Sequence, residues 1–368
     1  MADKQDILAS TRKGLFTISP GGSGWDRPRP AGFLGDRVVL TMVDPRDGAW
    51  YAALDLGHFG GKLHRSQDRG RTWTELAVPA YPEGATVEAG DGKAPKPAKL
   101  ELLWSLAPGG ADQPGRLWAG TIPGGLFVSD DRGASWSLVD ALWNEPSRPD
   151  WFGGGYDAPG IHSISVDPRD SRRVLVGISC GGIWETTDDG ASWTVRSEGM
   201  RAAYMPPERQ DDPTIQDPHR LVRCPVEPDV LWVQHHNGVF HSADCGRTWR
   251  ELKVEPSSFG FAVVVHPKDA RKAWFVPAVA DEKRLPVDGA LCVTHTADGG
   301  ERFVAQRKGL PQEACYDLVY RHALAIDAGG DRLAFGSTTG NLWTTADDGA
   351  TWQRISHTLP PIYAVTFG

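Results

Sequence analysis

The residues best suited to chemistry in this 368-residue chain are histidines, because six of the 11 recur at matching positions of a repeated pattern. Three stand five residues before a turn at the end of a predicted strand, and these are His162, His219 and His322. Three more stand eight to ten residues before a repeated aspartate: His58, His235 and His236. Neutral imidazole binds borderline divalent metals, and several imidazoles together also suit an anion. The spacing therefore predicts one shared ligand site at the strand ends.

This site has three interpretations. A metal centre would use His162, His219, His322, His58 and His236, with a divalent transition metal as the cofactor. No His-x-x-x-His or His-Glu-x-x-His spacing occurs, so the same cluster is also interpreted as an anion site. In the third interpretation each imidazole hydrogen-bonds only its own loop.

Other polar residues flank the histidines. The predicted ligand-binding side chains are Arg220, Arg321, His235, Arg12 and Arg223. The predicted catalytic groups are Asp157, Glu101, Tyr316 and Asp317. A carboxylate near an imidazole can orient the ring or act as a base. The alternative for the His-Arg pairs is a ring of salt bridges that closes a channel.

These residues are positioned by a motif, Ser/Thr-x-Asp-x-Gly-x-Thr/Ser-Trp, which we call the box motif. Its six copies are Ser66 to Trp73, Ser129 to Trp136, Thr186 to Trp193, Ser242 to Trp249, Thr296 to Phe303 and Thr345 to Trp352. The Asp and Ser/Thr side chains cap backbone N–H groups of a tight turn, and the Gly adopts a conformation that disfavours a Cβ. Each copy therefore predicts a β-hairpin. A seventh unit, from Gly14 to Trp25, has the same spacing with Pro20 in place of the Asp.

Seven units in 368 residues give roughly 50 residues each, the size of a four-stranded propeller blade. In the clearest unit we expect strands over Ile161–Val166, Arg173–Ser179 and Gly182–Thr186, with Trp193 opening the fourth. The first and last segments, Ile7–Ser10 and Ile362–Phe367, each lack a partner. The prediction is an all-β, seven-bladed propeller of antiparallel blades, one domain over 1–368, closed by pairing of the C-terminal strand with the N-terminal blade.

Four insertions depart from the repeat. They cover Pro79–Lys99, Asn144–Gly160, Gly199–Pro218 and Ala278–Ala290. All join strands on the face opposite the box motifs, where the histidine columns also end. Long irregular loops are commonly functional. We therefore expect the ligand site on this face, at the mouth of the central channel.

The composition and charge limit the classes of partner and the cell compartment that we expect for this protein. A net charge of −8 argues against nucleic acid or an anionic membrane, and no apolar run reaches the ~18 residues of a membrane helix. The start of the chain, Met1 to Ile7, lacks an apolar signal core, which predicts a cytoplasmic protein. The five cysteines are odd in number and scattered, so we expect reduced thiols.

The box motif resembles the Asp-box, or BNR, repeat of sialidase-like β-propellers, and the chain is similar to bacterial glycosyl-hydrolase-like proteins with this repeat. The resemblance covers nearly the whole chain. It implies a propeller, but the repeat also occurs in xyloglucan-cleaving enzymes, sortilin-type receptors and photosystem assembly factors. Sialidases carry an early Arg-Ile-Pro motif and six blades, whereas this chain has Arg27-Pro28-Arg29-Pro30 and seven units. Sialidase activity is therefore not expected.

The sequence thus favours an enzyme of hydrolase or lyase type, acting on a small polar or anionic substrate at the histidine-rich mouth. One alternative is a non-catalytic binding or assembly module that uses the same face. Another is a glycoside hydrolase with two carboxylates. The expected partner is a small-molecule or carbohydrate-like ligand, and no particular oligomeric state is indicated.

Overall fold

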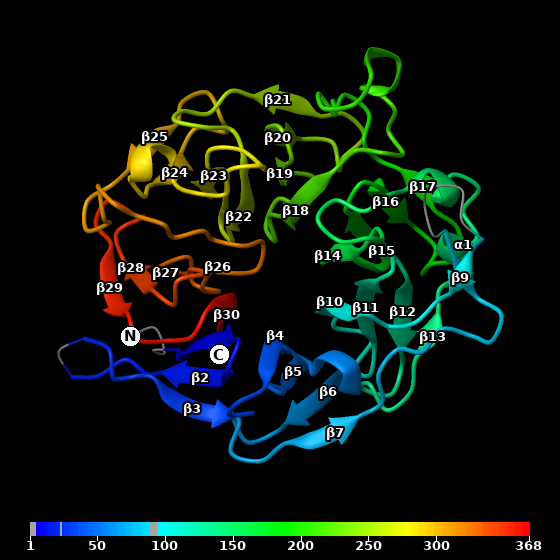
Figure 1. Cartoon of the computed structure of the whole chain (residues 1–368), viewed down its shortest axis with the longest axis horizontal. Coiled ribbons are helices and arrows are strands. Elements are labelled where there is room, and N and C mark those ends of the chain that lie inside the picture. Colours follow the sequence, from blue (N-terminus) through cyan, green and yellow to red (C-terminus); the bar gives the residue numbers. More distant parts are fainter. Residues whose placement is uncertain (1–4, 23, 89–93) are drawn as a thin grey trace.

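The computed structural model describes residues 5–22, 24–88 and 94–368. Over these residues the chain forms seven four-stranded antiparallel sheets, arranged as the blades of a ring (Figure 1). Helix is confined to one short α-helix and a few 3-10 turns in the same residues. The prediction of an all-β, seven-bladed propeller is confirmed.

Each blade runs from an inner strand beside the ring axis to an outer strand. The inner strands of blades 1 to 7 are β30 (Ile362–Phe367), β4 (Arg37–Val43), β10 (Leu102–Pro108), β14 (Ile161–Asp167), β18 (Pro218–Arg223), β22 (Gly260–His266) and β26 (Leu324–Ile326). The second strands are β1 (Ile7–Thr11), β5 (Trp50–Asp55), β11 (Leu117–Ile122), β15 (Asp170–Ile178), β19 (Leu231–His235), β23 (Asp269–Pro277) and β27 (Leu333–Gly336). The third strands are β2 (Gly14–Ile18), β6 (Gly61–Ser66), β12 (Leu126–Ser129), β16 (Gly182–Thr186), β20 (Val239–Ser242), β24 (Val293–Thr296) and β28 (Leu342–Thr345). The outer strands are β3 (Arg29–Gly32), β7 (Thr74–Leu76), β13 (Ser137–Leu138), β17 (Thr194–Val195), β21 (Arg250–Leu252), β25 (Val304–Gln306) and β29 (Gln353–Ser356).

The ring closes in blade 1, where both ends of the chain meet. β1 pairs with β30 from Ile7 opposite Phe367 to Thr11 opposite Ile362. Figure 1 shows β30, in red, against the blue strands of the same blade. This pairing removes the exposed edges that an open array of blades would have. The predicted closure of the ring is therefore present.

The box motifs form the turns between third and outer strands. In the first copy the Ser66 hydroxyl accepts from the backbone N–H of Gly70 at 2.8 Å, and Asp68 accepts from the N–H and hydroxyl of Thr72 at 2.9 and 2.6 Å. In the fifth copy Asp298 accepts from two backbone N–H groups, those of Glu301 and Arg302. Glu301 and Arg302 are therefore tolerated, because the turn depends on backbone donors.

Tryptophans tie neighbouring blades together. The indole N–H of Trp73 donates to the carbonyl of Ala31 in blade 1, and that of Trp249 donates to Arg196 in blade 4. Larger contributions to the core come from second-strand tryptophans, among them Trp50, Trp118, Trp232 and Trp274, which are almost fully buried. Packing between blades is thus built on the second strands, with the box motifs reinforcing it.

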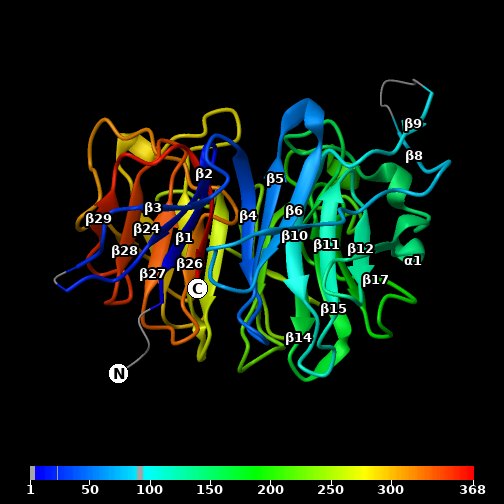
Figure 2. The same ribbon diagram turned by 90° about the horizontal axis from the view of Figure 1, so that it is seen from below.

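The remaining elements belong to the connections. They are β8 (Thr86–Val87), β9 (Lys96–Pro97), α1 (Asp140–Trp143), η1 (Gly57–Phe59), η2 (Arg148–Asp150), η3 (Pro207–Arg209) and η4 (Val287–Gly289). β9 lies at the outer edge of the ring near α1 in Figure 1, and its partner β8 lies beside it in Figure 2. Residues 89–93 of the first insertion lie outside the described residues. Within the described ranges, the helices are all too short to cross a membrane.

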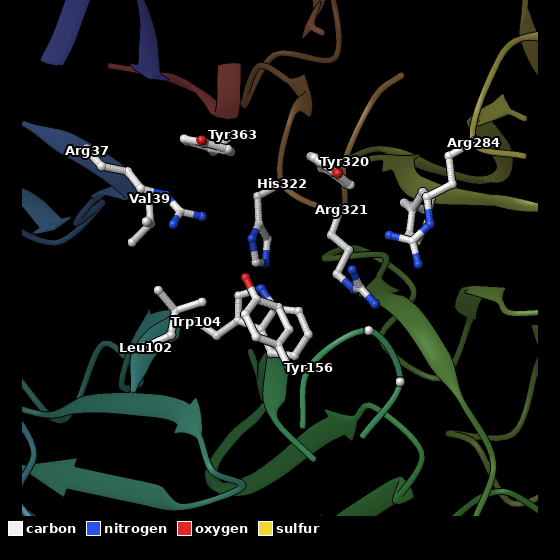
Figure 3. A pocket seen from close by; sticks show the side chains of 13 residues that line it. Arg37, Val39, Leu102, Trp104, Tyr156, Arg284, Tyr320, Arg321, His322 and Tyr363 are labelled. Carbon is white, nitrogen blue, oxygen red and sulfur yellow. The ribbon is translucent and has the colours of Figure 1, made fainter. Parts of the chain in front are cut away.

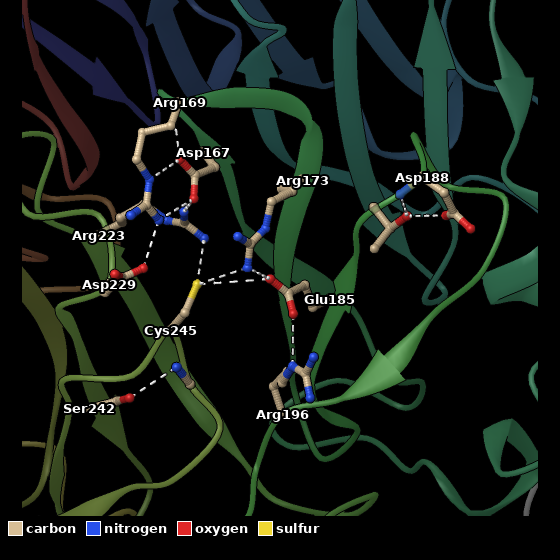
Figure 4. Close-up of polar contacts among 12 residues, drawn as sticks. Asp167, Arg169, Arg173, Glu185, Asp188, Arg196, Arg223, Asp229, Ser242 and Cys245 are labelled. Atoms are coloured by element: carbon tan, nitrogen blue, oxygen red, sulfur yellow. Dashed lines mark hydrogen bonds and ion pairs between the residues drawn. The ribbon is translucent and has the colours of Figure 1, made fainter.

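On the face that carries the box motifs, charged side chains join blades 4 and 5 (Figure 4). Asp167, at the end of β14, accepts hydrogen bonds from Arg169 and from Arg223 of the next blade. Glu185 pairs with Arg173 and Arg196, both at 2.8 Å. The carboxylates of Asp167 and Glu185 are almost fully buried, and each has two arginine partners. We call these six residues, with Cys245, the inter-blade network.

Candidate functional site

A pocket of about 310 Å³ opens at the ring axis on the insertion-bearing face. Four inner strands line it near their first residues, with Arg37, Trp104, Phe261 and Tyr363. The segment before β26 adds Tyr320, Arg321 and His322, and two insertions add Tyr156 and Arg284. Figure 3 shows these side chains converging on one space, which we call the axial pocket.

The axial pocket is cationic. Arg37, Arg284 and Arg321 line it, and the described lining residues include no Asp or Glu. Arg37 pairs with Asp55 at 2.8 Å and Arg284 with Asp281 at 2.6 Å. Arg321 is 8 % exposed, and its buried Nε and Nη2 atoms find no hydrogen-bond partner among the described residues. Burial lowers the pKa of the Arg321 guanidinium, yet an arginine stays charged near neutral pH.

Aromatic rings form the walls around Arg321. Its guanidinium carbon lies 4.7 Å from the centroid of the Trp104 ring and 5.2 Å from that of Phe261. Tyr156, from the second insertion, packs edge-on against Trp104 with ring centroids 5.3 Å apart. Cation–π contacts hold the Arg321 side chain in place without using up its N–H donors. A planar or sugar-like ligand with a negative group fits this combination of faces and donors.

His322 presents a free ring nitrogen in the same pocket. Its Nε2 atom lies 2.8 Å from the carbonyl oxygen of His162 and therefore donates to it. Burial, helped by the charge of Arg220, holds the pKa of His322 well below its ordinary value. The imidazole is thus neutral, and Nδ1 has a lone pair with no hydrogen bond from the described residues.

Below His322 the channel is blocked. The carbonyl of His162 also accepts from Nη1 of Arg220 at 3.3 Å, which brings three inner-strand entrances together. His162 itself is fully buried beside Trp104. A second cavity of about 470 Å³ lies beyond this contact and is lined by both Arg220 and His322. The axial pocket is therefore closed at its base by the side chains of His322 and Arg220, which meet at the backbone carbonyl of His162.

A second group of predicted residues gathers beside the pocket around Asp217. Its Oδ2 atom lies 3.4 Å from Nε2 of His219 and 3.3 Å from Nδ1 of His236. Both Asp217 and His219 are buried, while His236 is half-buried. His235 accepts a hydrogen bond from the backbone N–H of Asp217 at 3.0 Å, so it holds the loop rather than facing the pocket.

Other predicted residues lie outside the described pocket lining. His58 is exposed in η1 and packs against Phe59 with tilted rings, and Arg12 is exposed after β1. Arg223 lies at the opposite end of β18, in the inter-blade network. Tyr316 is 64 % exposed. The structure therefore separates these four residues from the axial pocket.

The predicted catalytic carboxylates are also dispersed. Asp157 is exposed and lines a separate cleft with Arg148 and Trp151. Glu101 lies 3.7 Å from Lys96 of β9. Asp317 is buried and already saturated, because Ser337, Thr339, Asn341 and Cys315 all donate to it.

Sequence reasoning missed several pocket residues, notably Arg37, Trp104, Arg284 and Tyr363. Arg37, Trp104 and Tyr363 lie at or near the start of an inner strand, in the region where the histidine columns also lie. Extending the column comparison from histidine to all polar and aromatic residues would have found these three. Arg284 belongs to an insertion without a repeat partner, so no register predicts its place.

Comparison with known proteins gives hydrolase relatives for part of the chain. The oligoxyloglucan-reducing end-specific xyloglucanase of Emericella nidulans is 33% identical over 292 residues, 76% of this chain and 32% of that enzyme. A probable enzyme of the same kind from Neosartorya fischeri is 32% identical over 168 residues, 45% of this chain and 18% of that protein. The chain thus spans a third or less of the length of these two relatives. No protein-family model matches it.

Solved structures support the fold. An ancestral GH74 enzyme superposes with a TM-score of 0.60 at 13% identity, over 97% of this chain and 40% of that one. A putative 6-phosphogluconolactonase from Bacteroides fragilis gives a TM-score of 0.58 at 10% identity, over 100% of this chain and 98% of that one. At these identities the likeness concerns the fold alone. The chain is a seven-bladed β-propeller with xyloglucanase-like neighbours.

Proposed function

We propose that this protein is an enzyme of hydrolase or lyase type that acts on a small anionic substrate held in the axial pocket. The observation that carries the proposal is Arg321, a buried cation whose Nε and Nη2 atoms have no partner among the described residues. A buried, unpaired charge is costly, so such a group is expected to have a partner in the working state. A carboxylate or phosphate supplies both the charge and the acceptors that a guanidinium lacks.

The relatives support hydrolysis rather than a particular substrate. The two similar proteins named above are xyloglucanases, and xyloglucan is an uncharged polysaccharide. Three arginines in the lining point instead to an anionic ligand. The walls of Trp104 and Tyr156 suit the flat face of a sugar ring. We therefore propose a sugar-like anion, such as a sugar acid or a sugar phosphate, as the substrate class.

His322 is the proposed general base. Its Nε2–H is held by the carbonyl of His162, which leaves Nδ1 free to take a proton from water or from a carbon atom beside the substrate's anionic group. Taking that proton from water leads to hydrolysis, and taking it from carbon leads to elimination. In both cases Arg321 and Arg37 would stabilise negative charge that develops on substrate oxygen atoms.

A glycoside hydrolase with two carboxylates is less well supported. It needs both groups about 5 to 10 Å apart across the bond to be cleaved. Asp157 and Glu101 lie outside the lining, and Asp317 is saturated by four donors. A binding module without catalysis would use the same arginines, so a kinetic test separates that alternative.

The binding test compares charged and neutral ligands of similar shape. Galacturonate and glucose 6-phosphate are titrated calorimetrically into the protein, with galactose and glucose as neutral counterparts. We expect at least tenfold tighter binding of an anion, lost in Arg321→Leu. Arg172→Leu is the matched control, because Arg172 is exposed on the opposite face and pairs with Asp170 in its own turn. Equal binding of neutral and charged sugars would contradict the proposal.

The catalytic test uses His322→Gln. Glutamine keeps a donor for the His162 carbonyl but cannot accept a proton. On lactone or ester derivatives of the bound anion, we expect kcat to fall about 100-fold or more while KM changes little. Tight binding with no turnover of any derivative by the wild type would instead identify a binding module.

A further inference from the structure

We infer that Asp217, His219 and His236 form a binding site for one divalent transition-metal ion beside the axial pocket. Ion binding itself is independent of the proposed function, whereas a catalytic part for the ion rests on it. The three candidate ligand atoms are Oδ2 of Asp217, Nε2 of His219 and Nδ1 of His236, all within 4.8 Å of one another. They come from the entrance to β18 and from the turn after β19 of the same blade.

The separations suit ligands of a common ion better than hydrogen bonds. Oδ2 of Asp217 lies 3.4 and 3.3 Å from the two imidazole nitrogens. Direct charge-assisted hydrogen bonds between such groups are usually about 2.7 to 2.9 Å long. Tetrahedral ligands with bonds of about 2.1 Å lie ~3.4 Å from one another. An ion can therefore be placed between these atoms with a small movement of one ring.

The hydrogen bonds of His219 fix which nitrogen faces the carboxylate. Nδ1 lies 2.6 Å from the carbonyl oxygen of Gly260, which only accepts, so Nδ1 carries the proton. In a neutral imidazole Nε2 then has a lone pair, and it points at the Asp217 carboxylate. Two acceptors facing each other are stabilised by a cation between them, either a proton on Nε2 or a metal ion. An Nδ1–H to a backbone carbonyl is also the usual support of a histidine that binds metal through Nε2.

Hydrogen bonds also fix the orientation of the Asp217 carboxylate. Its Oδ1 atom accepts from the hydroxyl of Ser179 at 3.2 Å and from the backbone N–H of Cys180 at 3.1 Å. Its own backbone N–H donates to His235. The loop and the carboxylate plane are therefore fixed, and Oδ2 is the atom left to bind an ion.

Gly154 connects this site to the axial pocket. It lines the pocket, and a Cβ built on it would lie 3.1 Å from Oδ2 of Asp217 and 2.7 Å from Oγ of Ser179. A larger residue would fill the space in front of the ligand atoms. Because Gly154 both lines the pocket and approaches Oδ2 of Asp217, the proposed ion would lie next to the substrate pocket.

Two imidazoles and one carboxylate favour a borderline ion such as Zn²⁺, Mn²⁺ or Fe²⁺ over Ca²⁺ or Mg²⁺. Two histidines and one carboxylate with an open position are also a known catalytic zinc set. Such an ion polarises a substrate oxygen or lowers the pKa of bound water. Set beside the anion-binding arginines, it would supply the nucleophile or the electrophile for the proposed reaction.

The test uses the full chain, stripped with a chelator and freed of any histidine tag. Co²⁺ is titrated and followed by its visible d–d absorption, and Zn²⁺ is then used to displace it. We expect one equivalent to bind. Asp217→Asn and His236→Ala should each weaken Co²⁺ binding by more than the 10- to 100-fold typical of losing an outer-shell partner. His58→Ala is the control, since that histidine is exposed outside the site, and it should bind like the wild type.

X-ray absorption of the wild-type Zn²⁺ complex provides a readout that does not depend on the variants folding. It should show two imidazole ligands and oxygen ligands. Absence of stoichiometric binding, or binding that both variants retain, would overturn the inference. Anion binding through Arg321 is measured separately, so an anion-binding protein without a metal would leave the proposed function standing. A protein that binds the metal ion but no anion would leave the metal site standing and would contradict the proposed function.

Discussion

The inter-blade network and the axial pocket each hold one buried arginine, Arg223 and Arg321, and among the described residues only Arg223 has a carboxylate partner. In the network every arginine meets a carboxylate: Arg223 and Arg169 bind Asp167, while Arg173 and Arg196 bind Glu185. In the pocket Arg321 lies against Trp104 and Phe261, with no carboxylate partner among the described residues. The same type of side chain is thus paired within the scaffold at one end of the ring and left without a carboxylate partner among the described residues at the other.

This difference indicates where stability and function lie. Burial raises the pKa of Asp167, but the hydrogen bonds from Arg169 and the charge of Arg223 outweigh it and bring the pKa to about 2. The network is therefore complete within the folded chain. The pocket is incomplete in the same sense, because Arg321 has no carboxylate partner among the described residues, and a ligand can supply one.

The largest expected effect comes from breaking the network. Arg223→Met should lower the free energy of unfolding by about 3 kcal/mol, because it removes one partner of a buried carboxylate. Arg321→Met should change it by less than about 1 kcal/mol or raise it, since the variant removes an unpaired buried cation and keeps apolar packing. Urea denaturation of the two variants measures both. Similar destabilisation by both substitutions would remove the distinction between the two regions.

A bound anion should raise the free energy of unfolding through its contact with the pocket, and it should not change the contribution of the network. At 100 times its dissociation constant, a bound anion stabilises the wild type by about 2.7 kcal/mol. Arg321→Met should lose this increment, whereas Arg223→Met should gain as much as the wild type. Thermal or urea unfolding with and without the ligand checks this. If the anion protects Arg321→Met equally, it binds somewhere else.

The box motifs should make the stability of the fold depend on pH without affecting anion binding in the axial pocket. Hydrogen bonds from the hydroxyl and N–H of the next Thr or Ser lower the pKa of Asp68 and of Asp131 from 3.8 to about 2. A carboxyl with a lowered pKa in the folded state stabilises the fold above its ordinary pKa. This contribution is therefore present above pH 3.8 and is lost as the pH falls toward about 2.

The measurement is the urea midpoint of the wild type and of the double variant Asp68→Asn with Asp131→Asn, at pH 5 and pH 2.5. The variant should show the smaller change between the two values. Anion affinity at neutral pH should be the same in both proteins. An equal pH dependence would mean that other carboxyl groups account for the acid sensitivity.

The smallest expected effect concerns Cys245. Its sulfur lies 3.7 Å from Arg173 and 3.8 Å from Arg223, between the two ion-pair groups of the network (Figure 4). Cys245→Ala should cost about 1 kcal/mol or less, because the carboxylates keep their arginines. Chemical denaturation resolves such a change. A loss as large as that of Arg223→Met would show that the thiol itself holds the network together.

Sequence alone determined the repeat, the strand order and the closure of the ring. The box motif is local: its donors and acceptors lie within a few residues, as in the bonds between Ser66, Asp68 and Gly70. Strand limits followed in part for the same reason: Gly182–Thr186 and Ile362–Phe367 were predicted with the bounds observed, whereas the strand predicted over Arg173–Ser179 is β15 (Asp170–Ile178). Local hydrogen bonds and a period-two pattern need no knowledge of distant residues.

The tertiary structure decided which polar residues meet. His162, His219 and His322 share one register, yet His219 turns to Asp217 while His322 faces the pocket and rests on the carbonyl of His162. Arg284 reaches the pocket from an insertion. Arg223 lies away from the pocket, because it is the last residue of β18, at the end that faces the box motifs. A register fixes a residue's height along its own blade. Which side chains converge depends on seven strands approaching one axis, and on loops that no repeat constrains.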